Sequence, residues 1–369
     1  METVRFGEIA SFKTGKLNSN AAVENGAYPF FTCSPETLRI NDYAFDQEAI
    51  LLAGNNAEGN FNIKYYEGKF NAYQRTYVIS NDPTKADLQY LYYALKLCLQ
   101  HFKSISQGTA TKFLTAQILN SFEMPMPELY VQKKIASILR TFDEKIELNT
   151  KINQNLYDQL TAYYNHLFSN IDCSLTVSDL SINVFSGGTP STSNEAYWNG
   201  DYYWLSSGET SERFIPSTIK TITEAGIENS STRKAEKYDI VIASAGQGHT
   251  RGQTSMLLTD SYVNQSIIVV HATKAYLPYL FWNISNRYEE LRVISNSNSI
   301  RGSLTTKMIN SLSIPKANEN DIKAFSEYAW PIIYNIENNL LENMRLTGMR
   351  DVLLPKLMSG ELDVSEIKV

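Results

Sequence analysis

The chain contains an internal repeat in which residues 190 positions apart carry the same or similar side chains. Nearer the start the offset falls to 174, so the second copy has about 16 additional residues. We expect them at 211–234, in a loop rich in Ser, Thr and Glu. A period of this length indicates two domains of one kind rather than a solenoid. The matched segments include Leu114-Thr115 with Leu304-Thr305, Asn120-Ser121 with Asn310-Ser311, Pro125 with Pro315, and, at the shorter offset, Asn25-Gly26 with Asn199-Gly200.

Each copy begins with a mixed part and ends with a helical part. Apolar runs at 49–53 and 266–270 are typical of strands, and segments 87–99 and 276–292 predict helices. Residues 128–168 contain neither Gly nor Pro, which favours one long helix. The corresponding segment of the second copy contains Pro331, so we expect a kink or break near residue 330.

Both helical parts carry a heptad pattern with steps of four and three residues. Asn occupies the same two positions of each pattern, and apolar residues occupy most of the others. Apolar positions supply burial, and polar positions fix the register of a coiled coil. We therefore predict that the helices pair as an antiparallel intramolecular coiled coil with register residues Asn149, Asn153, Asn339 and Asn343. The alternative is that each helix packs only on its own domain. The run Asp143-Glu144-Lys145 is expected on a solvated face.

The predicted fold class is α+β. Two mixed α/β domains are joined by two long helices and related by a pseudo-twofold axis. The predicted boundaries are 1–127 for the first mixed domain, 128–170 for the first long helix, 171–317 for the second mixed domain, and 318–369 for the second helix with a C-terminal tail.

Composition excludes several broad classes of protein. Of 369 residues 43% are hydrophobic, which indicates a globular chain, and the net charge of −6 argues against a protein that is basic all over. Three cysteines in an odd, unclustered pattern predict neither a disulfide framework nor a zinc site. There is no long apolar run and no apolar signal core, so we expect a cytoplasmic protein with no membrane contact.

The sequence shows no pattern of residues that would carry out a reaction. A Walker A motif, the amino-methyltransferase motif and a catalytic triad are not recognisable, and the four histidines are not at metal-ligand spacing. We therefore expect a protein that is not an enzyme, with no catalytic residues, no metal and no cofactor.

Acid-free windows recur at corresponding places in the two copies. No Asp or Glu lies between Asp87 and Glu123 or between Glu290 and Glu319, although both windows contain Lys or Arg. Two further acid-free windows span 68–81 and 240–259. Lys and Arg neutralise phosphates, and Arg, Asn and Gln read base edges. The candidate DNA-binding residues are Lys69, Tyr73, Gln74, Arg75, Gln107, Thr109, Thr111, Lys112, Gln247, His249, Arg251, Asn264, Gln265, Asn298, Arg301 and Lys307.

The chain resembles specificity (S) subunits of type I restriction–modification systems over nearly its whole length. The first copy departs from the pattern at Lys13-Thr-Gly-Lys16 and at Phe168-Ser-Asn170. The resemblance rests on the order of several segments: Phe185-Ser-Gly-Gly-Thr-Pro-Ser191, Trp198-Asn-Gly-Asp-Tyr-Tyr-Trp204, Asp239-Ile-Val-Ile-Ala243, Asn264-Gln265-Ser266, Leu304 through Ile314-Pro315, and Leu353-Leu-Pro-Lys-Leu-Met-Ser-Gly-Glu-Leu362.

This resemblance implies that each mixed domain is a target recognition domain that binds one half of a split, asymmetric sequence in double-stranded DNA, while the helices form the spacer that sets the gap. It also implies two methyltransferase (M) subunits as partners and restriction (R) subunits that add cleavage. Two alternatives stay open from sequence: the specificity chain of a type II-like fused nuclease–methyltransferase, and a coiled-coil scaffold that does not bind DNA.

Overall fold

The chain divides into two compact units, each containing one mixed domain and a share of both long helices. The computed structural model describes residues 2–246, 248–296 and 302–364. Unit 1 contains Met1–Ile146 and Arg345–Val369, and unit 2 contains Glu147–Met344. The two units are described separately below.

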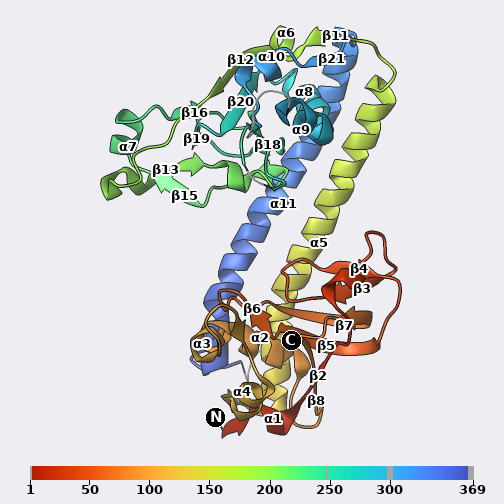
Figure 1. The fold of residues 1–369 in the computed structure, drawn as a ribbon, viewed down its shortest axis with the longest axis vertical. Coiled ribbons are helices and arrows are strands. Elements are labelled where there is room, and N and C mark those ends of the chain that lie inside the picture. Colours follow the sequence, from red (N-terminus) through yellow and green to blue (C-terminus); the bar gives the residue numbers. More distant parts are fainter. Residues whose placement is uncertain (1, 247, 297–301, 365–369) are drawn as a thin grey trace. The chain divides into compact units, whose positions relative to one another are not determined.

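The mixed domain of unit 1 is built on a six-stranded sheet with the order β2-β8-β5-β7-β3-β4 (Figure 1). Neighbouring strands are antiparallel except for β3 and β7, which are parallel. Two small ribbons, β1-β10 and β6-β9, complete the strands of the domain. Its elements are β1 (Glu2–Arg5), α1 (Phe6–Ile9), β2 (Ala10–Thr14), β3 (Tyr28–Phe31), β4 (Leu38–Ile40), β5 (Phe45–Ala53), β6 (Asn55–Asn56), β7 (Ile63–Ala72), β8 (Thr76–Asn81), α2 (Leu88–Leu97), α3 (Leu99–Ile105), β9 (Lys112–Phe113), α4 (Ala116–Ser121) and β10 (Glu123–Met126).

The mixed domain of unit 2 repeats this plan. Its main sheet has the order β12-β20-β17-β18-β14, and β14 is parallel to β18 as β3 is to β7. The ribbon β11-β21 corresponds to β1-β10. The internal repeat of the sequence is therefore a repeat of topology. The elements are β11 (Cys173–Thr176), α6 (Val177–Leu180), β12 (Ser181–Ser186), β13 (Trp198–Leu205), β14 (Phe214–Ile215), β15 (Lys220–Ile222), α7 (Glu224–Glu228), β16 (Arg233–Ala235), β17 (Ile240–Ala243), β18 (Thr254–Leu257), β19 (Ser261–Val263), β20 (Ile267–Ala272), α8 (Leu277–Ser285), α9 (Tyr288–Asn296), α10 (Thr306–Asn310) and β21 (Ser313–Pro315).

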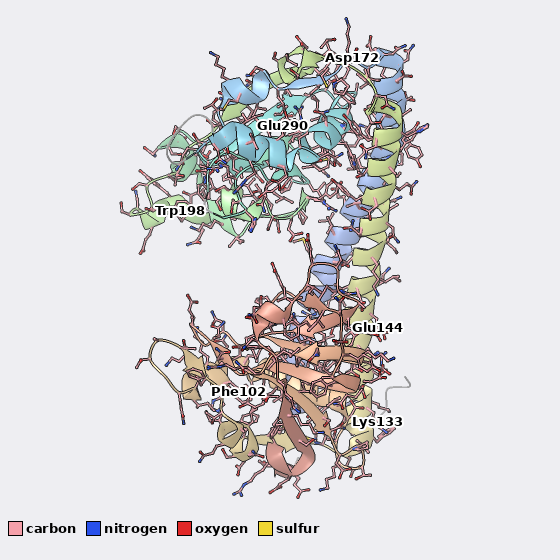
Figure 2. All side chains as sticks on the ribbon, turned by 45° about the vertical axis from the view of Figure 1, so that its right-hand side comes forward. Phe102, Lys133, Glu144, Asp172, Trp198 and Glu290 are labelled. Atoms are coloured by element: carbon pink, nitrogen blue, oxygen red, sulfur yellow. The ribbon has the colours of Figure 1, made fainter. Side chains whose placement is uncertain are left out.

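The segment 211–234 is not the loop that its composition predicts. It contains β14, β15, α7 and the start of β16, and unit 2 has a second sheet with the order β15-β13-β19-β16. Phe214, Ile215 and Ile222 are buried. Pairing with strands elsewhere in the chain supplies the backbone hydrogen bonds of these short strands, and local composition does not reveal such partners. Trp198 begins β13 in this sheet (Figure 2).

Two long helices follow the mixed domains, α5 (Leu129–Phe168) and α11 (Glu319–Ser359). The predicted break near residue 330 is wrong, because α11 continues through Pro331 as a single helix. Ala329 and Ile333 lie in the core of unit 2, and Trp330 stacks on Tyr334 with ring centroids 5.5 Å apart. Tertiary packing on both sides of Pro331 thus offsets the loss of one backbone hydrogen bond.

The helices pair antiparallel, as the seam predicts. In unit 2, Asn149 donates to Oδ1 of Asn343 at 2.9 Å, and Asn339 donates to Oδ1 of Asn153 at 2.8 Å. As residue numbers rise on α5 they fall on α11, which defines the antiparallel direction. The Asn positions of the two seams are therefore direct partners.

Each unit has its own apolar core, to which both helices contribute. In unit 1, Phe102 of α3 (labelled in Figure 2) belongs to a cluster that includes Leu139 of α5 and Leu357 of α11. In unit 2, Phe168 of α5 and Phe325 of α11 pack with residues of α8. Each helix thus buries one face on its own mixed domain in addition to its seam, so both packing modes considered from the sequence occur together.

Asp143 does not lie on a solvated face. Its carboxylate accepts a hydrogen bond from Tyr93 Oη at 2.7 Å and pairs with Arg350 at 2.5 Å, all within unit 1. The charge pattern around residue 143 predicted exposure because its partners are about 50 and 200 residues away in the chain.

Candidate nucleic-acid interface

In unit 1 the structure brings residues of the two acid-free windows onto one surface. Strand β9 pairs with β6, so Lys112 lies opposite Asn56. Gln107 and Phe113 exchange backbone hydrogen bonds at 3.0 and 2.7 Å. The guanidinium of Arg75 lies over the ring of Phe113, 5.2 Å from its centroid. Arg75, Gln107 and Lys112 therefore come from separate segments and meet on one surface, which we call the unit 1 basic surface.

A tight turn at residues 56–60 extends this surface. Gly59 has φ +76°, and a Cβ there would lie 3.0 Å from Lys103 Cγ and 3.3 Å from Lys112 Cγ. Lys103 Nζ donates to Asn60 Oδ1 at 2.8 Å. The two lysine stems thus lie against the same glycine, which leaves room for both. Lys103 and Asn60 were not among the candidates, and only the acid-free window around Lys103 indicated its place.

The other unit 1 candidates have partners of their own or lie in the loop before β9. The ammonium of Lys69 is 4.7 Å from the ring centroid of Tyr43. Gln74 donates to Asn18 Oδ1 at 2.7 Å, and Tyr73 forms a bridge with Leu17. Thr109 is exposed and Thr111 half-buried in the loop that leads to β9.

In unit 2, Arg251 supports the loop that follows β17. Its side chain is only 8% exposed, and Nη2 donates to Asn296 Oδ1 at 2.5 Å. A Cβ on Gly302 would lie 2.2 Å from Nη1 of Arg251, so the guanidinium fills the space beside that glycine. The loop is also held by α9, since Tyr288 Oη donates to the carbonyl of His249 at 2.7 Å. Arg251 therefore acts as internal support for the loop.

The remaining unit 2 candidates differ in exposure. Asn264 is buried and accepts a hydrogen bond from Ser266 N at 2.9 Å, which shapes the turn before β20. Gln265 is exposed and accepts from Thr189 at 2.5 Å. His249 and Lys307 have exposed side chains. Gln247, Asn298 and Arg301 lie outside the described residues.

One contact places corresponding loops together in both copies. Leu114 N donates to Gly54 O at 2.9 Å in unit 1, and Leu304 N donates to Ser244 O at 2.9 Å in unit 2. Thr115 and Thr305 then cap the next helices, α4 and α10, through their side-chain oxygens. In each copy the loop after a central strand, β5 or β17, thus lies beside the loop that precedes α4 or α10. The basic windows of the sequence include the loops before α4 and α10.

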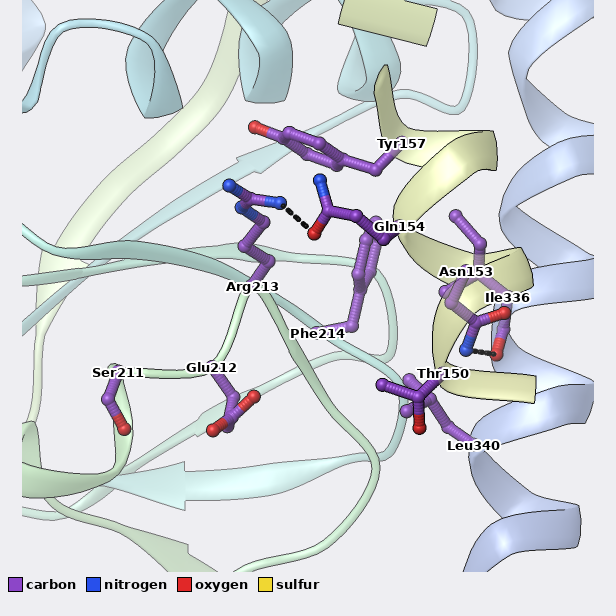
Figure 3. A pocket seen from close by; sticks show the side chains of 10 residues that line it. All are labelled: Thr150, Asn153, Gln154, Tyr157, Ser211, Glu212, Arg213, Phe214, Ile336 and Leu340. Carbon is purple, nitrogen blue, oxygen red and sulfur yellow. Dashed lines mark hydrogen bonds between the residues drawn. The ribbon is translucent and has the colours of Figure 1, made fainter. Parts of the chain in front are cut away.

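A cleft in unit 2 lies between α5, α11 and residues 211–214 (Figure 3). It encloses about 340 Å³. The guanidinium of Arg213 stacks 3.9 Å from the ring centroid of Tyr157, and Nη1 donates to Gln154 Oε1 at 3.1 Å. Glu212 is the one acidic side chain in the lining, so the cleft does not hold the paired carboxylates of a hydrolytic site.

Buried Asp239 pairs with half-buried His271 within the second domain. His271 Nδ1 is 2.7 Å from Asp239 Oδ1. Burial raises the pKa of Asp239, while backbone and His271 hydrogen bonds oppose the shift. The carboxylate also accepts from the backbone N–H of Glu236 at 2.8 Å, so the pair ties β17 to β20.

Among the described residues, His, Cys, Asp and Glu side chains form no cluster able to hold a metal ion. No helix in the described ranges combines the length and apolar character needed to cross a bilayer.

Two repeated mixed domains on a pair of antiparallel helices define a two-domain recognition architecture. The family of type I restriction modification DNA specificity domains matches residues 1–157 and 176–324. The chain belongs to this family.

Named relatives carry the same description. The specificity subunit of the Escherichia coli type I restriction enzyme EcoDI is 40% identical over 146 residues, covering 40% of this chain and 32% of the relative. The match thus spans about a third of that protein. The specificity subunit of the Haemophilus influenzae enzyme HindI is 22% identical over 345 residues, covering 71% of this chain and 74% of the relative. The crystal structure of a type I restriction–modification S subunit from M. genitalium shares the fold, with a TM-score of 0.64, 18% identity and coverage of 96% and 95%.

Proposed function

We propose that this chain is the DNA-recognition subunit of a type I restriction–modification system. Each recognition domain binds one half of a split, asymmetric duplex sequence, and the helix pair sets the gap between the halves. The observation that carries this proposal is the loop contact formed twice, at Leu114–Gly54 and Leu304–Ser244, beside basic windows of both copies. Family membership and the repeated topology support it.

The chemistry of modification belongs to partners in this proposal. The chain binds and positions, and two methyltransferase subunits carry S-adenosylmethionine and transfer the methyl group to adenine. Restriction subunits add cleavage. Because the substrate of this complex is chromosomal DNA, we expect the complex in the cytoplasm. In unit 1, Arg75, Lys103 and Lys112 suit phosphate contact, while the amide of Gln107 suits contact with a base edge.

The test is affinity purification of the tagged chain from its native host, with masses and stoichiometry of the co-purifying proteins. Two copies of an adenine methyltransferase per chain are expected. Methylome mapping of the host and of a deletion strain should then reveal one split motif that is lost on deletion. Recovery of the chain with partners unrelated to DNA modification, and an unchanged methylome, would replace this proposal with a scaffold function. A single fused nuclease–methyltransferase partner would place the chain in a type II-like system.

A further inference from the structure

Unit 2 contains a buried junction between its recognition domain and α11. Tyr238, two residues before β17, donates from Oη to Glu337 Oε2 at 2.8 Å. Lys237 Nζ lies 2.5 Å from Glu337 Oε1, and the Glu337 side chain is only 9% exposed. One helix carboxylate therefore receives both a phenol proton donor and a cation from the recognition domain. Such charge-assisted hydrogen bonds are short and directional.

The backbone at this junction is strained. Tyr238 has φ +76°, a conformation that residues with a side chain rarely adopt. Its ring packs on Trp330 and Tyr334 of α11 at centroid distances of 4.9 and 5.9 Å. A strained backbone conformation of this kind persists where contacts with surrounding residues hold it in place. The contacts on α11 therefore hold Tyr238 in one orientation.

Unit 1 contains a junction of the same chemistry. Tyr93 of α2 donates from Oη to Asp143 Oδ2 on α5 at 2.7 Å. Arg350 of α11 lies 2.5 Å from Asp143 Oδ1, and its side chain is mostly buried. Here too a tyrosine of the recognition domain meets a carboxylate of a long helix that is paired with a cation.

The two junctions are not products of the sequence repeat. At the offset of 190, Asp143 corresponds to Ile333, and Glu337 corresponds to Glu147. Glu147 instead forms an exposed pair with Lys151 one helical turn away. The same three-part contact is thus made from unrelated positions, which points to a shared requirement at both domain–helix joints.

The need to attach each mixed domain to the helices does not by itself explain these two contacts. The apolar core of each unit already contains residues of its mixed domain and of both helices. Apolar burial is non-directional, whereas a tyrosine–carboxylate contact fixes an angle. We propose that Tyr93–Asp143 and Tyr238–Glu337 are positioning contacts that hold each recognition domain at one angle on the helices, and so restrict the half-site gap that the assembled complex accepts. This inference rests on the proposed function.

The experiment uses the purified complex of the full chain with its methyltransferase partners. Duplexes carry the mapped half-sites with the native gap, or with a gap one base pair shorter or longer. Initial methylation rates give the discrimination ratio between native and altered gaps. Tyr238→Phe and Tyr93→Phe remove one hydroxyl and keep the ring, and Glu337→Gln removes the charge and replaces one of the two acceptor oxygens by an amide NH2 group. Glu147→Gln is the matched control, because it breaks an exposed ion pair with Lys151 within α5.

Loss of a hydrogen bond to a charged group predicts a fall of about tenfold in the discrimination ratio for the three test variants. Wild-type ratios are expected for the control. Unchanged ratios in Tyr238→Phe and Tyr93→Phe would overturn the inference. A uniform fall in rate at all gaps, with the ratio kept, would overturn it as well, because the contacts would then serve stability alone. Failure of the wild-type complex to methylate any split target would instead refute the proposed function.

Discussion

Asn339 donates from Nδ2 to Oδ1 of Asn153 at 2.8 Å, so two amides that lie on different helices pair at the seam in unit 2. Asn153 in turn donates to the carbonyl of Ile336 at 3.3 Å. Both amides are half-buried. A slip of either helix by one heptad step would separate this pair and leave each amide facing apolar seam residues. The pair therefore selects one register among several that the apolar residues alone would allow.

The first prediction concerns this pair. Asn153→Leu alone leaves the Asn339 amide without its acceptor and should lower the free energy of unfolding by about 1–2 kcal/mol. Asn153→Leu with Asn339→Leu replaces both amides and should recover most of that loss. Denaturant unfolding of these two variants, of Asn339→Leu alone and of the wild type measures the coupling between the sites. Strictly additive losses in the double variant would show that the amides act independently.

A second prediction concerns the unit 1 basic surface. Lys112→Ala in the assembled complex should weaken binding to duplex DNA about fivefold, whatever the sequence, and lower the slope of log K against log salt by about 1. Fluorescence anisotropy at several salt concentrations measures both quantities. The control is Lys133→Ala, an exposed lysine on α5 (Figure 2). Equal slopes for the two variants would place Lys112 away from DNA.

Insertion of seven residues into both α5 and α11 is the third test. A heptad adds about 10 Å to a helix and nearly preserves its faces. We expect the preferred gap to lengthen by about three base pairs, because one base pair rises about 3.4 Å, while the half-site bases stay the same. Methylome sequencing of a strain carrying the insertion reads out both. The helices do not set the gap if the motif is unchanged.

Alkaline pH provides the fourth test. Burial, followed by the hydrogen bond to Asp143, raises the pKa of Tyr93 above its ordinary value near 10. A pKa raised in the folded state gives stability that is complete below pH 10 and is lost as pH rises further. Tyr93→Phe should therefore make the fall in unfolding free energy between about pH 9 and pH 11 shallower. Tyr130→Phe, at a side chain that is 59% exposed, is the control. Parallel pH profiles for wild type and Tyr93→Phe would contradict this assignment.

The repeated topology and the helix pair were predictable from sequence because they rest on regular spacing. Matches at 190 residues indicated two copies, and those copies share a strand order. The Asn positions of the seams predicted partners that the structure brings within hydrogen-bond distance. Both inferences needed only periodicity, which the sequence carries along its whole length.

Features that depend on distant partners were not predictable. The short strands β14, β15 and β16 form because they pair with β18, β13 and β19, respectively. Arg251 looked like a DNA contact because it is a cation near glycines, yet its fit against Gly302 and Asn296 buries it. Lys103 joins the basic surface through the turn at Gly59. In each case the decisive neighbour lies at least 16 residues away, beyond the range of local pattern.

The division into units has a consequence for the order of folding during synthesis. Unit 2 is one continuous segment, Glu147–Met344, whereas unit 1 also needs residues from Arg345 onward. Leu354, Leu357, Met358 and Val364 all belong to the apolar core of unit 1. On a ribosome, the second recognition domain can therefore complete its core while the first, although made earlier, still waits for the last helix. The segment Met1–Ile146 thus leaves the ribosome before unit 2 and reaches its native packing after it.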